Sequence, residues 1–323
     1  MQKYFSVVLV LGLVFLSYSL LSERSLVFNA MSEGFDIWKN NLFPALFPFF
    51  VISNLLVNFG FAHFLDKLLG RFISNFFNIN PKSSFVIIMS IISGFPSSAK
   101  YIKEAYDDNL INKLDATKLL LICHFSNPMF VLGTVAITFL NNKNVGLLIL
   151  LSHYIPNIVI GIILRKYGIK REKEGKSSLY GALKQMHHVR ISNQKNIGEI
   201  VTNAFVTSIN TLLLILGTVT FFLTVSKLIS CNINLGIIGN TIICMIFEIT
   251  SGLKMMSYLD FSLVFKTVLA SAFISFGGLS VHMQLFSIMP HLGINYKYFF
   301  ITRIFHAALS AITCLLLFKV FLF

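Results

Sequence analysis

The stretch "SGFPSSAK", residues 93–100, ends an apolar run that begins at Phe85. A transmembrane helix of about 20 apolar residues satisfies its own backbone hydrogen bonds, and glycine and proline interrupt that pattern. Unwound backbone at membrane depth is tolerated only where it is buried in protein or lines a cavity. The stretch therefore predicts a broken helix inside a polytopic membrane protein, in a place suited to binding a solute.

The composition is that of an integral membrane protein without a sizeable soluble domain. Of 323 residues, 55% are hydrophobic and 12% are charged, and the mean hydropathy is +0.77. Soluble domains average about 25% charged residues. We interpret the net charge of +13 as an excess of Lys and Arg in cytoplasmic loops. No basic stripe alternates with aromatic residues outside the apolar runs, so we expect no nucleic-acid partner.

Nine apolar segments are candidates for crossing the membrane, and the basic segment 166–196 orients them because the positive-inside rule places it in the cytoplasm. The first apolar segment resembles a signal peptide. It is longer than the about 7–15 residues of a signal h-region and no A-x-A site follows it, so we expect an uncleaved anchor over residues 1–30. The segments lie at about 4–21, 38–65, 84–99, 117–140, 145–165, 200–226, 233–250, 261–286 and 298–322.

The segment 84–99 decides the topology, because a full crossing there would place the basic segment outside the cell. A re-entrant hairpin over Ser84–Leu110 that enters and leaves on the cytoplasmic side removes this conflict. A charge at the bilayer centre costs about 2.5–3.5 kcal/mol, so the charged returning arm must pack against protein. The same argument predicts a second hairpin, 235–262, that enters from the outside and turns at Ser251-Gly252.

The order of these elements repeats in two halves, 31–165 and 197–323. A histidine follows the serine of each turn by 31 residues: His124 follows Ser93, and His282 follows Ser251. Because the halves enter the membrane from opposite sides, they form an inverted-topology repeat, the architecture of many secondary transporters. The predicted fold is thus an all-α polytopic membrane protein with an inverted-topology repeat, two re-entrant helical hairpins and broken transmembrane helices.

Four interruptions are predicted to meet near the midplane, where freed helix N-termini present N–H groups and a positive dipole end to a carboxylate. The alternative for each is a structural kink, since Gly and Pro are common in membrane helices and serine bonds within them. The interruptions are 93–98, 126–128, 250–252 and 276–280. The predicted solute-binding residues are Ser93, Gly94, Ser97, Ser98, Lys100, Ser126, Asn127, Ser251, Gly252, Lys254, Gly277, Gly278 and Ser280.

Ionisable residues inside the apolar runs are candidates for coupling transport to an ion or a proton. Glu248 is an intramembrane carboxylate and is predicted to take a proton or help coordinate a cation; the alternative is a pair with Lys254. His124 and His282 are predicted to donate hydrogen bonds or pass protons, with packing as the alternative. Weaker candidates of the same kind are Gln284, Arg303 and His306.

The sequence offers no pattern typical of an enzyme. It contains neither H-E-x-x-H nor G-x-S-x-G, and the stretch Glu174–Ser177 resembles a phosphate-binding loop but has Lys170 in place of the first glycine. The four cysteines form no C-x-x-C pair, and three of them lie inside apolar runs. We therefore expect a protein that is not an enzyme and that holds no metal or cofactor.

Four of these stretches resemble the YlbJ-type sporulation integral membrane proteins of stage V, over roughly residues 30–320. The resemblance implies a nucleoside-recognition (Gate) domain, similar to concentrative nucleoside transporters, with two hairpins and two broken helices. It also implies a role in sporulation and movement of dipicolinate, a small aromatic dicarboxylate, across the outer forespore membrane. This chain is shorter, and its second turn has Lys254-Met-Met where the first has Pro96-Ser-Ser. The stretches are 93–100, 127–130, 248–252 and 276–284.

Function hypotheses of two classes follow. The first is a secondary transporter of a small anionic metabolite, with dipicolinate as the leading substrate and a nucleoside or other metabolite as the alternative. The second is a non-transporting scaffold or receptor in sporulation, whose basic segment holds anionic lipid or a partner. In both cases the protein is expected in the cell membrane as a multi-pass protein, and a homo-oligomer is left open.

Overall fold

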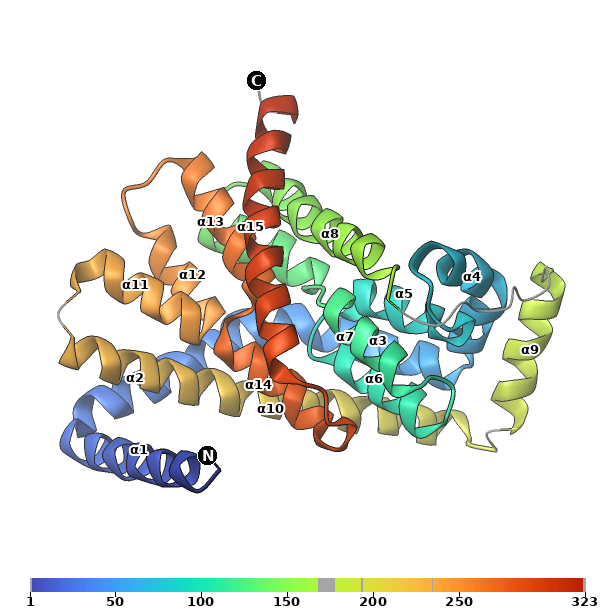
Figure 1. The fold of residues 1–323 in the computed structure, drawn as a ribbon, viewed down its shortest axis with the longest axis horizontal. Helices are drawn as coiled ribbons and strands as arrows, with labels where there is room; N and C mark the ends of the chain where they lie inside the picture. Colours follow the sequence, from blue (N-terminus) through green and yellow to red (C-terminus); the bar gives the residue numbers. More distant parts are fainter. Residues whose placement is uncertain (1, 168–177, 193, 234, 322–323) are drawn as a thin grey trace.

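The chain folds entirely into helices. The computed structural model describes residues 2–167, 178–192, 194–233 and 235–321, and every regular element in these ranges is helical (Figure 1). This confirms the predicted all-α fold. Part of the predicted basic segment, 168–177, lies outside the described residues, and with it the phosphate-loop-like stretch.

Fifteen α-helices and four short helical segments of other types follow one another along the described chain. The π-helical turns are η1 (Trp38–Leu42) and η3 (Phe130–Phe139), and the 3₁₀ turns are η2 (Pro81–Ser83) and η4 (Pro290–Leu292). The α-helices are α1 (Gln2–Ser22), α2 (Arg24–Ile37), α3 (Phe43–Asn58), α4 (Phe61–Phe77), α5 (Ser84–Ser93), α6 (Ser97–Asp107), α7 (Lys113–Ile122), α8 (Asn144–Leu164), α9 (Leu179–Ser192), α10 (Ile197–Asn232), α11 (Gly236–Phe247), α12 (Ile249–Ser257), α13 (Leu263–Phe276), α14 (Gly278–Ile288) and α15 (Tyr296–Phe321).

Five helical stretches of the described chain are long and apolar enough to cross a membrane. Shorter apolar helices accompany them, among them Pro81–Ser93 and Gly236–Phe247. This pattern confirms a multi-pass membrane protein in which some apolar segments are too short to cross alone. The five stretches are Arg24–Asn58, Asn144–Leu164, Ile197–Asn232, Leu263–Ile288 and Tyr296–Phe321.

Two pairs of short helices, α5–α6 and α11–α12, fold back on themselves, as Figure 1 shows. The first pair breaks at Gly94–Pro96, inside the predicted turn. The second pair breaks at Glu248, not at the predicted Ser251-Gly252, which lie inside α12. Whether these pairs are re-entrant in the membrane, and whether residues 31–165 and 197–323 are inverted repeats, stays a prediction.

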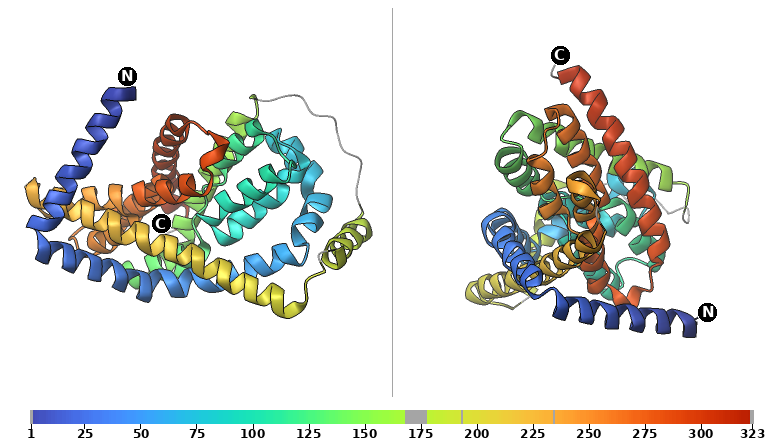
Figure 2. Two further views of the ribbon diagram at one scale, coloured as in Figure 1. Left: turned by 90° about the horizontal axis from the view of Figure 1, so that it is seen from below. Right: turned by 90° about the vertical axis from the view of Figure 1, so that its left-hand side faces the viewer.

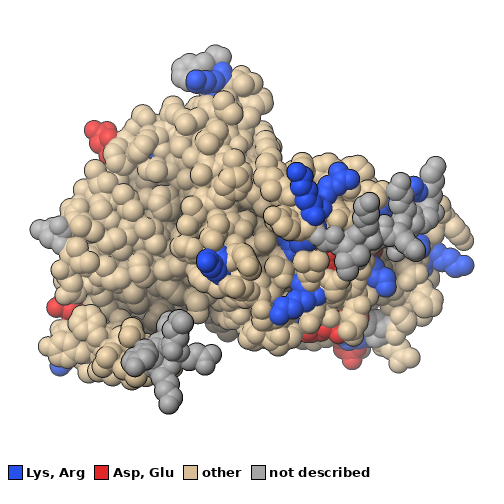
Figure 3. Space-filling view, viewed as in Figure 1, with Lys and Arg blue, Asp and Glu red and all other residues tan. Residues whose placement is uncertain are grey.

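Two further helices, the amphipathic α4 and the more polar α9, pack against each other at one end of the molecule (Figure 1). The prediction placed α9 in a loop and did not separate α4 from the span before it. Gly60, at φ +80°, starts α4, and Asn78, at φ +52°, ends it, because the left-handed conformation stops a helix. In Figure 3, most of the visible Lys and Arg side chains lie at this end of the molecule.

The 36-residue α10 runs along α2 and α3 (Figures 1 and 2), and α8, α13 and α15 pack against one another. Helix α1 projects away from the body (Figure 2), and most of its side chains from Ser6 onward are exposed. Many large apolar side chains of α1, α10 and α15 face outward, which suits lipid rather than water. The broken helices lie inside this frame.

Candidate functional site

The four predicted interruptions converge on one narrow internal cavity. Its free volume is about 30 Å³, room for about one or two water molecules. Each broken region contributes to the wall, and so do residues of both π-helical turns. The lining residues are Leu42, Leu46, Phe95, Ser126, Asn127, Phe130, Ile215, Val219, Glu248, Ile249, Thr250, Ser280, Val281 and Gln284.

The first two interruptions interlock at Gly94 and Asn127. Gly94 has φ +73°, and a Cβ there would lie 2.4 Å from the backbone nitrogen of Asn127. The Asn127 side chain donates to the Ser93 carbonyl oxygen (3.2 Å) and accepts hydrogen bonds from two backbone N–H groups of its own helix start. Only glycine permits this approach, so the unwound segments 94–96 and 123–127 support each other.

The third interruption is built around the carboxylate of Glu248, which is 1% exposed. Glu248 is the N-cap of α12 and accepts hydrogen bonds from the N–H groups of Thr250 (3.1 Å) and Ser251 (2.6 Å). The N–H groups that we expected to face a solute therefore already face a carboxylate of the chain. Gly252 lets α11 approach, because a Cβ there would lie 2.4 Å from the Met245 nitrogen.

The fourth interruption falls at Gly277 and Gly278, both with positive φ. A Cβ on Gly277 would lie 2.7 Å from His124 Nε2, and one on Gly278 would lie 3.2 Å from the Ile249 nitrogen. No side chain caps the start of α14, and its first turn brings Ser280 to the cavity. Unlike α12, this helix has no side-chain cap.

Two serine hydroxyls in the cavity wall, those of Ser126 and Ser280, are buried and have no hydrogen-bond partner among the described residues. Gln284 also lines the cavity, and its Nε2 donates to Thr218 Oγ1 on α10 (2.7 Å). Buried hydroxyls without partners are rare. The wall therefore offers unused polar groups to a small solute.

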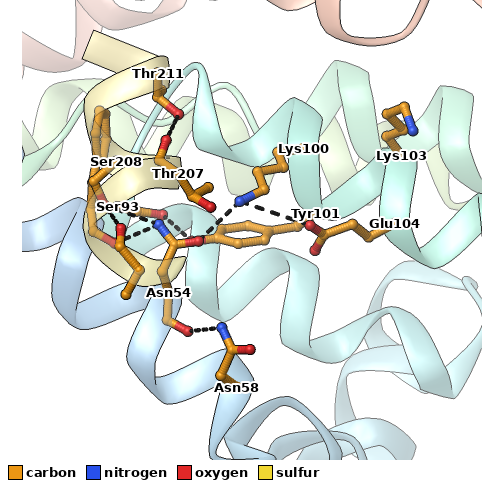
Figure 4. Close-up of polar contacts among 12 residues, drawn as sticks. Asn54, Asn58, Ser93, Lys100, Tyr101, Lys103, Glu104, Thr207, Ser208 and Thr211 are labelled. Atoms are coloured by element: carbon orange, nitrogen blue, oxygen red, sulfur yellow. Dashed lines mark hydrogen bonds and ion pairs between the residues drawn. The ribbon is translucent and has the colours of Figure 1, made fainter. Parts of the chain in front are cut away.

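Several predicted residues lie near the interruptions without lining the cavity. The Lys100 ammonium donates to Asn54 Oδ1 (2.9 Å) and lies 3.9 Å from Glu104. These contacts hold it in a polar strip between α3, α6 and α10, which Figure 4 shows. Others outside the wall are Ser93, Gly94, Ser97, Ser98, Ser251, Gly252, Lys254, Gly277 and Gly278.

The predicted histidines have different surroundings. His282 is engaged at both ring nitrogens, with Tyr296 Oη (2.9 Å) and the Phe276 carbonyl oxygen (2.8 Å). His124 is 1% exposed, and neither of its ring nitrogens has a partner among the described residues. It stacks on Phe95, with ring centroids 4.9 Å apart.

His153 of α8 was missed by the sequence analysis. Its Nε2 accepts a hydrogen bond from the Ser126 N–H (2.8 Å), so its Nδ1 donates to Ser275 Oγ (2.8 Å). His153 thus ties the second interruption to α13. A lone histidine three residues before Pro156 in an apolar run was the available signal.

No three His, Cys, Asp or Glu side chains gather to hold a metal ion in the part of the chain that the structure describes. Six polar residues instead share the wall with eight apolar ones; the polar residues are Ser126, Asn127, Glu248, Thr250, Ser280 and Gln284. Such a wall suits hydrogen bonding to an organic solute rather than tight chelation of a metal.

Fold and cavity together define a multi-pass integral membrane protein whose broken helices enclose a buried polar centre. The chain is 30% identical to the sporulation integral membrane protein YlbJ of Bacillus subtilis (strain 168), over 95% of this chain and 81% of that protein. The chain belongs to the YlbJ family of sporulation integral membrane proteins. No family model matches it, and no solved structure does. The expected nucleoside-recognition domain therefore stays an expectation.

Proposed function

We propose that this protein is a secondary transporter of a small anionic metabolite in sporulation, with dipicolinate as its leading substrate. The observation that carries the proposal is the cavity formed where four broken helices meet, with the unpaired hydroxyls of Ser126 and Ser280 in its wall. Polar groups at the meeting point of discontinuous helices are the usual site of secondary transporters. The relative's name supports the role in sporulation.

The cavity suits a planar, partly apolar solute. Phe95, Phe130, Ile215 and Val219 supply the apolar wall, and the serines and the uncapped start of α14 supply donors. Helix N-termini favour carboxylates. A pyridine ring that carries carboxylates, as in dipicolinate, matches both features.

A cavity of about 30 Å³ does not hold such a solute without opening. In the proposed cycle, the two helical pairs α5–α6 and α11–α12 move in turn and open the cavity to one side of the membrane at a time. Glu248 faces the cavity on the second pair and carries the coupling proton or cation. Protonation of its carboxylate would weaken its hold on the N–H groups of α12 and release them toward the solute.

The test is uptake of dipicolinate into liposomes that contain the purified protein, followed by the luminescence of trapped terbium. We expect entry above that of empty liposomes. Ser280→Ala should lower the rate about 10-fold, since a hydrogen bond to a charged group contributes about 1.5–3 kcal/mol. Ser152→Ala is the matched control, because this serine is equally buried but bonds to the Leu148 carbonyl oxygen of its own helix.

If the vesicles hold folded protein, proton and sodium gradients have been imposed, and dipicolinate still does not enter, then dipicolinate is not a substrate. Entry of uridine in the same vesicles would identify a nucleoside carrier. Failure of both solutes, and of other small carboxylates, would favour the scaffold or receptor hypothesis.

A further inference from the structure

A fully buried guanidinium lies behind the cavity on α15. Arg303 is 0% exposed and forms no ion pair with an Asp or Glu of the described chain. Its Nη2 donates to the Leu121 carbonyl oxygen, its Nη1 lies 3.0 Å from His306 Nδ1, and its Nε has no partner within the part of the chain that the structure describes. A cation without an acidic partner at this depth is costly to keep, so a functional role is expected.

His124 lies beside this cation, and neither of its ring nitrogens has a hydrogen-bond partner in the described ranges. The Phe299 ring contacts both residues: its centroid is 5.7 Å from that of His124 and 5.2 Å from Arg303 Cζ. The His306 ring, bonded to Arg303, lies 6.4 Å from the His124 ring. A guanidinium without an acidic partner in the described chain and an imidazole without a hydrogen-bond partner there thus lie together among buried aromatic rings.

The ring of Phe95 lies between His124 and the cavity. Phe95 stacks on His124, with ring centroids 4.9 Å apart, and it also lines the cavity. It belongs to the unwound segment 94–96 between α5 and α6, where its N–H donates to the Phe125 carbonyl oxygen (2.8 Å). A rotation of the Phe95 side chain would therefore open the cavity toward His124, which shares the Phe299 ring with Arg303.

We propose that Arg303 and His124 form an anion subsite behind Phe95 that holds one carboxylate of the solute. The inference rests on the proposed function and narrows it: the preferred substrates are dicarboxylates, with one carboxylate at this subsite and the other at Ser280 and the start of α14. The incoming carboxylate serves as the acidic partner that Arg303 lacks, and it accepts a hydrogen bond from His124. Charge-assisted pairs of this kind are about twice as strong as neutral hydrogen bonds.

The test is the binding of two related acids to the purified protein in detergent, measured as the rise in melting temperature with solute concentration. Dipicolinate carries two carboxylates and picolinate carries one. We expect the wild type to bind dipicolinate at least about 10-fold more tightly than picolinate. In Arg303→Met this preference should disappear. Arg190→Met, at an exposed arginine above the Phe59 ring, should keep it.

His124→Phe provides a second variant that leaves the guanidinium in place, should Arg303→Met not fold. It should reduce the preference for dipicolinate several-fold. A preference for dipicolinate that both variants keep overturns the inference, as does a wild type that no carboxylate stabilises. Uptake measurements with the same proteins separate the two proposals. If Arg303→Met transports dipicolinate as fast as the wild type, only the anion subsite is contradicted. If the wild type does not transport it, the proposed function is contradicted.

Discussion

At the scale of single residues, Glu248 combines two roles that conflict. It caps α12 through two backbone N–H groups, and it also faces the cavity where an anion is proposed to bind. No ion pair joins it to a Lys or Arg among the described residues, so the expected alternative, a pair with Lys254, is not what the structure contains. Its carboxyl group is held by the N-terminus of α12.

The variant Glu248→Gln tests whether Glu248 acts by capping α12 or by exchanging a proton. The amide keeps one oxygen for the N–H groups, so we expect the protein to fold with a loss of about 0.5–2 kcal/mol in unfolding free energy. Uptake should fall more than about 10-fold because a neutral amide cannot exchange a proton. Glu199→Gln is the matched control, since Glu199 belongs to an exposed capping box at the start of α10. Wild-type uptake in Glu248→Gln would leave Glu248 with a capping role only.

His63 of α4, outside the five helical stretches that are long and apolar enough to cross a membrane, makes stability depend on pH. Burial lowers its pKa, Lys82 lowers it further, and Asp108 opposes the shift. The unfolded chain therefore binds more protons than the folded one below the ordinary pKa of about 6.5, and stability falls as the pH decreases through that range. We expect a smaller decrease in melting temperature between pH 7.5 and 5.5 for His63→Gln than for the wild type. An equal decrease in both proteins would contradict this assignment.

At the scale of elements, three of the four interruptions could be located from the sequence because glycine and proline mark them. The break at Glu248 could not, since neither residue stands there; the chain breaks where a carboxylate caps a new helix. Helices α4 and α9 escaped detection because their polar residues lowered the local hydropathy. The separation of Lys100 from the cavity depends on packing between helices distant in sequence, which no local pattern contains.

Gly94 tests whether the first interruption is required for folding. Gly94→Ala places a Cβ 2.4 Å from the Asn127 nitrogen in a backbone with φ +73°. Strain of this kind costs about 1–3 kcal/mol before the clash is counted. We expect a marked loss of folded protein, measured by size-exclusion chromatography and melting temperature. Gly217→Ala is the control, because a Cβ there meets nothing within 4 Å, and it should leave the yield of folded protein unchanged.

At the scale of the whole molecule, the outer surface and the interior have opposite character. Outward apolar side chains on α1, α10 and α15 suit lipid, while polar groups gather where short helices meet inside. Unwound backbone is thereby kept from the hydrocarbon, as a membrane protein requires.

Cysteine labelling of the two helical pairs tests the inverted repeat. Three of the native cysteines are buried, and Cys231, near the start of the second pair, is exposed. If both pairs are re-entrant from opposite sides, a membrane-impermeant maleimide should label Lys82→Cys and Asp108→Cys from the cytoplasmic side, in a Cys231→Ser background. Native Cys231 and Tyr258→Cys should react from the other side only. Labelling of residues 82 and 108 from opposite sides would show instead that α5 and α6 together cross the membrane, and the inverted repeat would then have to be abandoned.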